Sequence, residues 1–193
     1  MKSIFFFALA LFATGVLFSN CEKTSSQNEP ETLAAIKAAQ IARGKYLMGS
    51  VGCDDCHTPK KMTPNGPEMD MERRFMGHPA AEPFEYADKK DMVARQQVAV
   101  FSAGMTAAAG PWGITYAANL TPDDTGTGNW TEAQFVKAIR EGKSKGLDGT
   151  RPLLPPMPWQ VYGQMNDEDL KSIYAFLRTV KPIQNVVPNP QTW

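Results

Sequence analysis

The chain has 193 residues, enough for one ordinary domain and a targeting segment. Its 20 basic and 20 acidic residues cancel, so its charge gives no indication of nucleic-acid binding. Fifteen prolines and fifteen glycines predict a large share of loop, and three cysteines are an odd number.

The N-terminus has the pattern of an export signal. Lys2 precedes an apolar run of about fifteen residues, shorter than the roughly twenty that a membrane-spanning helix needs. We therefore expect a signal peptide over residues 1–20. The run ends at Cys21 and resembles a bacterial lipoprotein signal, although Phe18 and Asn20 depart from the residues that such signals prefer. We expect lipidation of Cys21, with a secreted protein or an uncleaved anchor as the alternatives.

A polar stretch follows and predicts a flexible, lipid-anchored tether over residues 21–31, so the domain itself is expected over 32–193. Apolar residues recur over 32–48 without a proline and predict a helix that ends near Gly49. Gly44 inside this helix lowers its helix propensity. It is either simply tolerated or required where another helix crosses closely.

The next feature is Cys53-Asp54-Asp55-Cys56-His57, a C-x-x-C-H sequence. It is the attachment signal for a c-type haem, in which two thiols form thioethers and the imidazole ligates the iron. The alternatives are a zinc site, which needs four ligands, a thioredoxin-like site, which follows a strand, and a strained disulfide. Bacteria attach this haem outside the cytoplasm, in agreement with the export signal.

Helix breakers are dense over residues 58–67, where we expect no regular element. A ligating histidine normally donates its second ring N–H to an acceptor that fixes the ring. We expect the carbonyl of Pro67 to be this acceptor for His57. The alternative is that Gly66-Pro67 only turns the chain.

The middle of the chain gives weaker signals. Residues 91–100 suit a helix, whereas 98–102 suit a short strand. Residues 110–113 predict a turn, after which 114–116 can pair back as a hairpin. Residues 123–129 superficially resemble a calcium loop but lack its terminal Glu and alternating acidic ligands, so we interpret them as a turn.

Two helices with clear start signals follow. Thr131 caps the first, with Gln134 three residues later as in a capping box, and Gly142 stops it. Asn166 caps the second, with acidic residues at its positive end, and Pro182 ends it. The remaining tail is expected to be irregular.

A six-coordinate haem iron needs a second axial ligand. Prolines crowd around Met157 and stiffen its backbone, so ligation there costs little further entropy, and we expect Met157 to be that ligand. His78 is the main rival, and Met105 and Met165 are weaker candidates. His/Met ligation raises the reduction potential and closes the iron to substrates, which favours electron transfer over catalysis.

Together these features resemble the class I c-type cytochromes. More closely, they resemble the mono-haem domains of bacterial lipoprotein cytochromes and of the cytochrome subunits that serve dehydrogenases. Besides the haem motif, the resemblance rests on Arg43-Gly44-Lys45-Tyr46-Leu47, Gly66-Pro67, Gly77-His78-Pro79, Gly110-Pro111-Trp112-Gly113, Ala118-Asn119-Leu120-Thr121-Pro122-Asp123, Trp130-Thr131, Met157-Pro158-Trp159 and Asp169-Leu170.

The resemblance implies a mostly α, cytochrome c-like helical fold around one covalent haem c. A long Pro/Gly-rich insert, in which a short β-hairpin can form, separates His57 from Met157, the implied axial ligands. Gly44 is implied to lie where the first helix crosses the last, near Tyr174. The haem propionates are expected to find donors in the middle region, and the candidates are Trp112, Tyr116, Asn119 and Trp130.

The expected function is electron transfer outside the cytoplasm by a protein that is not itself an enzyme, with a lipid at Cys21 holding it to a membrane. The expected partners are a dehydrogenase or quinol-oxidising complex and a terminal oxidase or other acceptor. The alternatives are a haem enzyme, such as a peroxidase or sulfur-compound oxidase, and a gas-binding haem module. Both require an open sixth coordination position.

Overall fold

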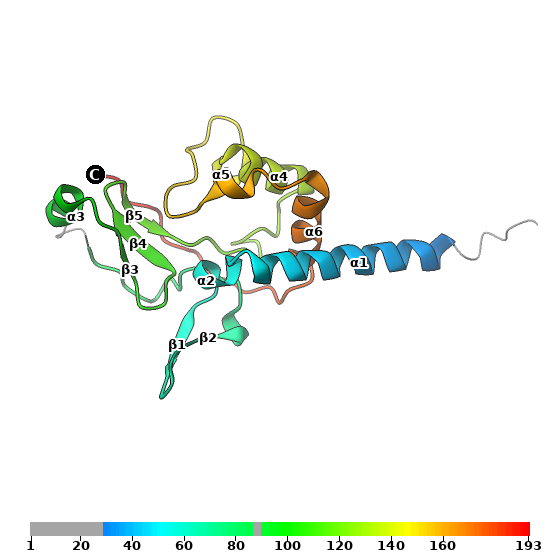
Figure 1. The fold of residues 1–193 in the computed structure, drawn as a ribbon, viewed down its shortest axis with the longest axis horizontal. Helices are drawn as coiled ribbons and strands as arrows, with labels where there is room; N and C mark the ends of the chain where they lie inside the picture. The colour runs from blue at the N-terminus through cyan, green and yellow to red at the C-terminus, as the bar shows by residue number, and fades with distance from the viewer. Residues whose placement is uncertain (1–28, 87–89) are drawn as a thin grey trace, which may run out of the picture.

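The computed structural model describes residues 29–86 and 90–193 (Figure 1). Its elements, in chain order, are α1 (Glu29–Ser50), α2 (Cys53–His57), β1 (Lys60–Thr63), β2 (Gly66–Met69), the 3-10 turn η1 (Met71–Arg73), α3 (Lys90–Gln96), β3 (Val100–Phe101), β4 (Ala107–Gly110), β5 (Gly113–Tyr116), α4 (Glu132–Glu141), the 3-10 turn η3 (Ser144–Gly146), α5 (Trp159–Tyr162) and α6 (Asp167–Leu177). The described chain is therefore mixed, with helices toward both ends and two small antiparallel sheets in the insert, rather than mostly α.

The first and last helices pack against each other around a core of Leu47, Met48, Phe75, Phe135, Ile173, Phe176 and Leu177. A Cβ at Gly44 would overlap the carbonyl of Ser172, so glycine is what lets the two backbones meet. The predicted close crossing of α1 and α6 near Tyr174 is thus confirmed. Arg43 ties the same crossing from outside through a 2.8 Å bond to Asp169.

The predicted start signals of the two C-terminal helices are confirmed. The Thr131 hydroxyl accepts from the Gln134 backbone N–H, and the Gln134 side chain returns to the Thr131 backbone N–H. Gly142 takes a left-handed conformation at the end of α4, and Asn166 caps α6. The end of α6 differs from the prediction, since the helix stops at Leu177, well before Pro182.

A hairpin forms where no regular element was expected. Strand β1 pairs with β2, and Thr63 lies opposite Gly66 around the Pro64-Asn65 turn. Both strands of a two-stranded sheet are edge strands, and an edge strand tolerates proline where the missing N–H would face solvent. Pro67 can therefore lie in β2. Breakers therefore set the turn without preventing the strands.

The N-terminal boundaries also change. Helix α1 already begins at Glu29, inside the predicted tether over 21–31. The predicted signal peptide and Cys21 lie outside the described residues. Within the described ranges, no helix combines the length and apolar character needed to cross a membrane.

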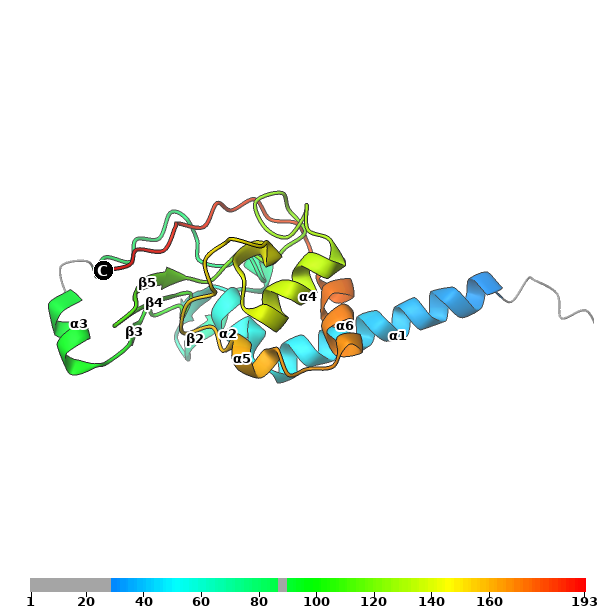
Figure 2. The same cartoon turned by 90° about the horizontal axis from the view of Figure 1, so that it is seen from above.

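The middle of the chain is arranged around α2. In both views the three-stranded sheet and α3 lie beyond one side of α2, while α4 and α6 lie on the other (Figures 1 and 2). Strand β4 pairs with β3 and with β5, whose turn joins Gly110 to Gly113. The C-terminal tail runs from α6 back to the sheet, where Gln191 and Ile114 exchange two backbone hydrogen bonds of 2.9 and 2.7 Å. The tail thus joins the helical half to the insert.

Candidate functional site

Two thiols lie one helical turn apart on α2. Cys53 and Cys56 are both partly buried, and neither forms a disulfide. Burial raises the pKa of the Cys53 thiol to about 12 and also raises that of Cys56. Such a site suits neutral sulfur, which is the state of a thioether. Among the described residues, no group of three or more His, Cys, Asp or Glu side chains is placed to hold a metal ion, so the zinc alternative has no support.

The imidazole of His57 is buried and has a fixed tautomer. Its Nδ1 lies 2.8 Å from the backbone carbonyl of Ala118. A carbonyl only accepts, so Nδ1 carries the proton and Nε2 keeps its lone pair, which is the form that ligates a metal. Burial lowers the pKa of His57 and favours this neutral form. A neutral imidazole that follows two free thiols is the donor set that a covalent haem c requires.

The predicted brace at Pro67 is wrong. Pro67 is exposed on β2, opposite Met62, and the acceptor for His57 is Ala118 instead. The prediction followed the nearest proline along the chain. The true acceptor is a backbone atom 61 residues away, for which the sequence offers no signal.

Ala118 lies in a segment that pairs with residues 75–78 through backbone hydrogen bonds. The Leu120 N–H donates to the Phe75 carbonyl (2.8 Å) and the His78 N–H to the Ala117 carbonyl (2.9 Å), so residues 75–78 run antiparallel to 117–120. Gly77 lies in this pairing with φ +75, and a Cβ there would overlap the Ala117 carbonyl. Its N–H donates to the His57 carbonyl at 2.9 Å. The insert therefore contacts both the backbone and the ring of His57.

The helix that carries the thiols has its own buried anchor. Asp54, 7% exposed, accepts two hydrogen bonds from Arg74, at 2.8 and 2.6 Å. The Thr58 hydroxyl also donates to Asp54 (2.8 Å) and accepts from the Phe75 N–H (3.1 Å). These bonds satisfy a carboxylate that would be costly to bury alone, and they hold α2 against the start of the insert.

His78 is occupied by protein on both ring nitrogens. Nε2 donates to the Glu82 carbonyl (2.8 Å), and Nδ1 accepts from the Thr106 hydroxyl (2.9 Å). The side chain is 2% exposed and its ring lies 4.9 Å from that of Tyr116. Both ring nitrogens of His78 are therefore engaged by protein groups. Tyr116 serves as the platform for His78, with its pKa raised by burial.

Met157 lies half-buried in the loop between η3 and α5. The Thr115 hydroxyl donates to the Pro155 carbonyl (2.8 Å), which ties the loop to β5. On the other side, the Tyr162 hydroxyl donates to the carbonyl of Val51, just before α2, at 2.8 Å. One anchor of the Met157 loop thus lies just before the haem motif, and the other lies on the strand that precedes Ala118. Tyr162 and α5 were missed by the sequence reasoning.

The four predicted propionate donors are not gathered in one place. Trp112 points its indole N–H at Thr115 (3.4 Å), beside the loop of Met157. Asn119 instead binds the C-terminal tail: its NH2 donates to the Ile183 carbonyl (2.8 Å) and its Oδ1 accepts from the Thr121 N–H (3.0 Å). The Asn119 amide thus has protein partners on both its NH2 and its oxygen. Trp130 packs against the helical core.

The chain is similar over much of its length to cytochrome proteins. It is 33% identical over 181 residues to the fructose dehydrogenase cytochrome subunit of Gluconobacter japonicus, which covers 93% of the chain and 29% of the relative. It is 31% identical over 147 residues to the gluconate 2-dehydrogenase cytochrome c subunit of Pantoea cypripedii, covering 75% and 24%. A diheme cytochrome c-type protein of Cereibacter sphaeroides is 24% identical over 157 residues, covering 81% and 41%.

The matched part is only a fraction of these relatives, since the chain spans between 24% and 41% of their length. No known family profile matches the chain. The names of the first two relatives describe cytochrome subunits of dehydrogenases.

Proposed function

We propose, from the premise that the chain is a c-type cytochrome resembling the cytochrome domains of dehydrogenase complexes, that it transfers electrons through one haem c held by Cys53, Cys56 and His57. The observation that carries the proposal is the neutral His57, fixed by Ala118, directly after two free thiols on one turn of α2. The bound haem c supplies a reversible one-electron couple between Fe(III) and Fe(II). The chain contributes the thioether sulfurs, the oriented imidazole and the burial around them.

The proposed second axial ligand is Met157. Support comes from the occupied nitrogens of His78 and from the two anchors that tie the Met157 loop to β5 and to Val51. Met105 is a poorer candidate because it is 43% exposed, and Met165 packs against the helical core. A thioether ligand favours Fe(II) and, with His57, closes the iron to substrates, so the site suits electron transfer rather than catalysis.

The proposed electron donor is a dehydrogenase outside the cytoplasm, and the acceptor a further redox protein such as a terminal oxidase. The similarity to the cytochrome subunits of fructose and gluconate 2-dehydrogenases supports a partner of this class. We further propose that residues 1–20 export the chain and that a lipid on Cys21 holds it to a membrane.

The three cysteines allow the attachment and the anchor to be tested separately. We expect wild-type protein from bacterial membranes to keep its haem on a denaturing gel. Cys56→Ser should lose covalent haem at one thioether, and Cys53→Ser with Cys56→Ser should lose it entirely. Cys21→Ser should keep the haem but leave the membrane fraction. Wild-type protein that releases its haem on denaturation would contradict the proposal.

The electron-transfer role is tested with the purified haem protein. We expect a reversible one-electron titration and no rapid binding of carbon monoxide to the reduced form, because both axial positions are filled. Rapid carbon monoxide binding would instead favour a haem enzyme or a gas-binding module.

A further inference from the structure

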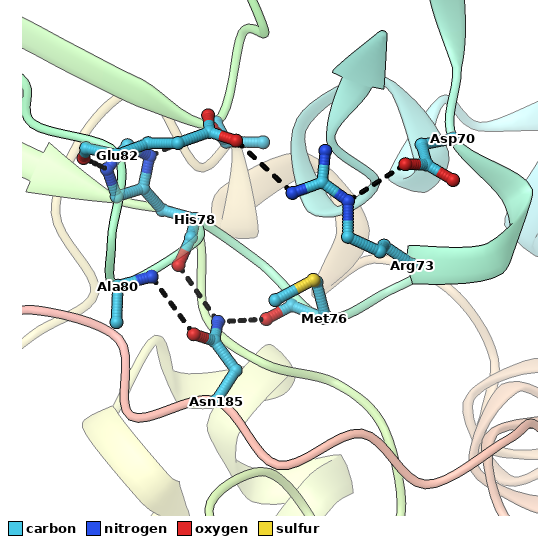
Figure 3. A network of polar contacts seen from close by, with 8 residues as sticks. Asp70, Arg73, Met76, His78, Ala80, Glu82 and Asn185 are labelled. Atoms are coloured by element: carbon cyan, nitrogen blue, oxygen red, sulfur yellow. Dashed lines mark hydrogen bonds and ion pairs between the residues drawn. The ribbon is translucent and has the colours of Figure 1, made fainter.

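One side chain from the C-terminal tail holds the segment that contacts His57. Asn185 is 6% exposed, and its Nδ2 donates to the carbonyls of Met76 (2.7 Å) and His78 (2.9 Å). Its Oδ1 accepts from the Ala80 N–H (3.0 Å), so the whole amide is used (Figure 3). Asn185 lies 109 residues from Met76 along the chain, so these bonds are purely tertiary.

The bonds of Asn185 hold a segment that contacts both His57 and the residue before Ala118. Between Met76 and Ala80 lie Gly77, whose N–H donates to the His57 carbonyl, and His78, whose N–H donates to the Ala117 carbonyl. The first bond fixes the backbone of His57. The second fixes the residue before Ala118, whose carbonyl accepts from the His57 ring. Asn185 therefore acts on both ends of one hydrogen bond without touching either.

The tail that carries Asn185 is itself hydrogen-bonded to the segment that follows Ala118. The Asn185 backbone N–H donates to the Thr125 hydroxyl (2.9 Å), and its carbonyl lies 3.4 Å from the Asn119 NH2. Asn119 follows Ala118 directly. The tail thus joins segment 76–80 to the loop that begins at Ala118, and it limits how far the two can separate.

We propose that Asn185 is a positioning residue for His57: it sets the strength of the bond from the His57 ring to Ala118 and, through it, the reduction potential of the haem. This inference rests on the proposed function. A strong bond from Nδ1–H makes the imidazole a more basic ligand and stabilises Fe(III). Loosening that bond therefore raises the potential.

The test compares Asn185→Leu and Asn185→Asp with wild type. Leu is close in size and makes none of the three hydrogen bonds, whereas Asp keeps the acceptor for Ala80 but loses both donors. The exposed neighbour Gln184→Leu is the matched control. We measure the midpoint potential of each haem protein, and by NMR of the reduced form the exchange of the His57 ring Nδ1–H with water.

Asn185→Leu should show a higher potential, and both Asn185 variants should show ring-proton exchange faster by about tenfold or more, while Gln184→Leu changes neither property. Variants that bind haem normally yet keep the wild-type potential and exchange would overturn the positioning role and leave the electron-transfer function intact. A wild-type protein without covalent haem would instead remove the function itself.

If neither Asn185 variant accumulates as a haem protein, hydrogen exchange of the wild type tests the proposal. The backbone N–H groups of Gly77 and His78 should then show the same free energy of opening as the His57 ring proton, once each rate is corrected for its intrinsic exchange, because one opening of the clamped segment exposes all three. A ring proton that exchanges independently of these two amides refutes the proposal.

Discussion

The His57 ring donates a 2.8 Å hydrogen bond to the backbone carbonyl of Ala118, 61 residues further along the chain. The acceptor that fixes the His57 ring therefore comes from the insert rather than from the loop that directly follows the haem motif. Gly77 adds a second contact, from its N–H to the His57 carbonyl. The insert thus has a structural role at the proposed iron ligand His57, and its packing has several measurable consequences.

Gly77→Ala should destabilise the protein by about 2–4 kcal/mol, because it adds a Cβ against the Ala117 carbonyl at a positive φ. Gly149→Ala is the matched control: Gly149 has the same φ of +75 but nothing within 4 Å of a Cβ. It should cost about 1 kcal/mol for the backbone alone. Urea unfolding of the two variants measures the difference, and equal costs would argue against the close crossing.

Arg74→Ala should lower the free energy of unfolding by about 2–4 kcal/mol, because it leaves the Asp54 carboxylate buried without its main partner. It also uncovers Phe75, over whose ring the guanidinium lies at 4.4 Å. The comparison is Arg95→Ala, which breaks an exposed 3.7 Å pair with Asp91 and should cost less than about 0.5 kcal/mol. Chemical denaturation of both variants tests this ranking. A loss of unfolding free energy for Arg74→Ala no larger than that for Arg95→Ala would contradict it.

Stability should fall as the pH is lowered below the ordinary histidine pKa of 6.5. Burial lowers the pKa of folded His78, so the unfolded chain takes up a proton before the folded chain does. The contribution is complete above 6.5 and is lost as the pH falls through the folded-state pKa, with a slope of at most about 1.4 kcal/mol per pH unit. Unfolding curves at several pH values should show a flatter dependence for His78→Gln. Parallel curves for the variant and the wild type would exclude His78 as the source.

Gly44→Ala should destabilise the protein by several kcal/mol, because the added Cβ overlaps the Ser172 carbonyl where α1 crosses α6. Gly49→Ala lies in the same helix and meets nothing within 4 Å. Its helix propensity should make it neutral or stabilising by up to about 1 kcal/mol. Thermal unfolding of the pair separates packing from propensity, and a stabilising Gly44→Ala would contradict the crossing.

The features predicted well from sequence depend on local chemistry. The capping box of Thr131 and Gln134, the cap at Asn166 and the left-handed Gly142 each act within one turn of helix, so the residue types alone indicate the structure. Gly44 was predicted from the family resemblance, since its neighbour Ser172 is far away in sequence.

The features that were missed depend on long-range backbone contacts. Ala118 braces His57 through its carbonyl, which every residue type has, so no sequence pattern marks it. The contacts of Asn119 and Asn185 were missed for a related reason. A side-chain NH2 can donate to a backbone carbonyl of the tail or the insert as readily as it can donate to a haem propionate. The β1–β2 hairpin was missed because prolines that break a central strand are allowed at an edge.

The most direct test of a closed His57/Met157 centre is the visible spectrum of the oxidised protein. We predict that the wild type shows the weak red absorption band of a methionine bound to Fe(III). Met157→Leu should abolish this band and allow rapid carbon monoxide binding after reduction, whereas Met105→Leu should leave both properties unchanged. A red band that persists in Met157→Leu, or that is absent from the wild type, would contradict the account.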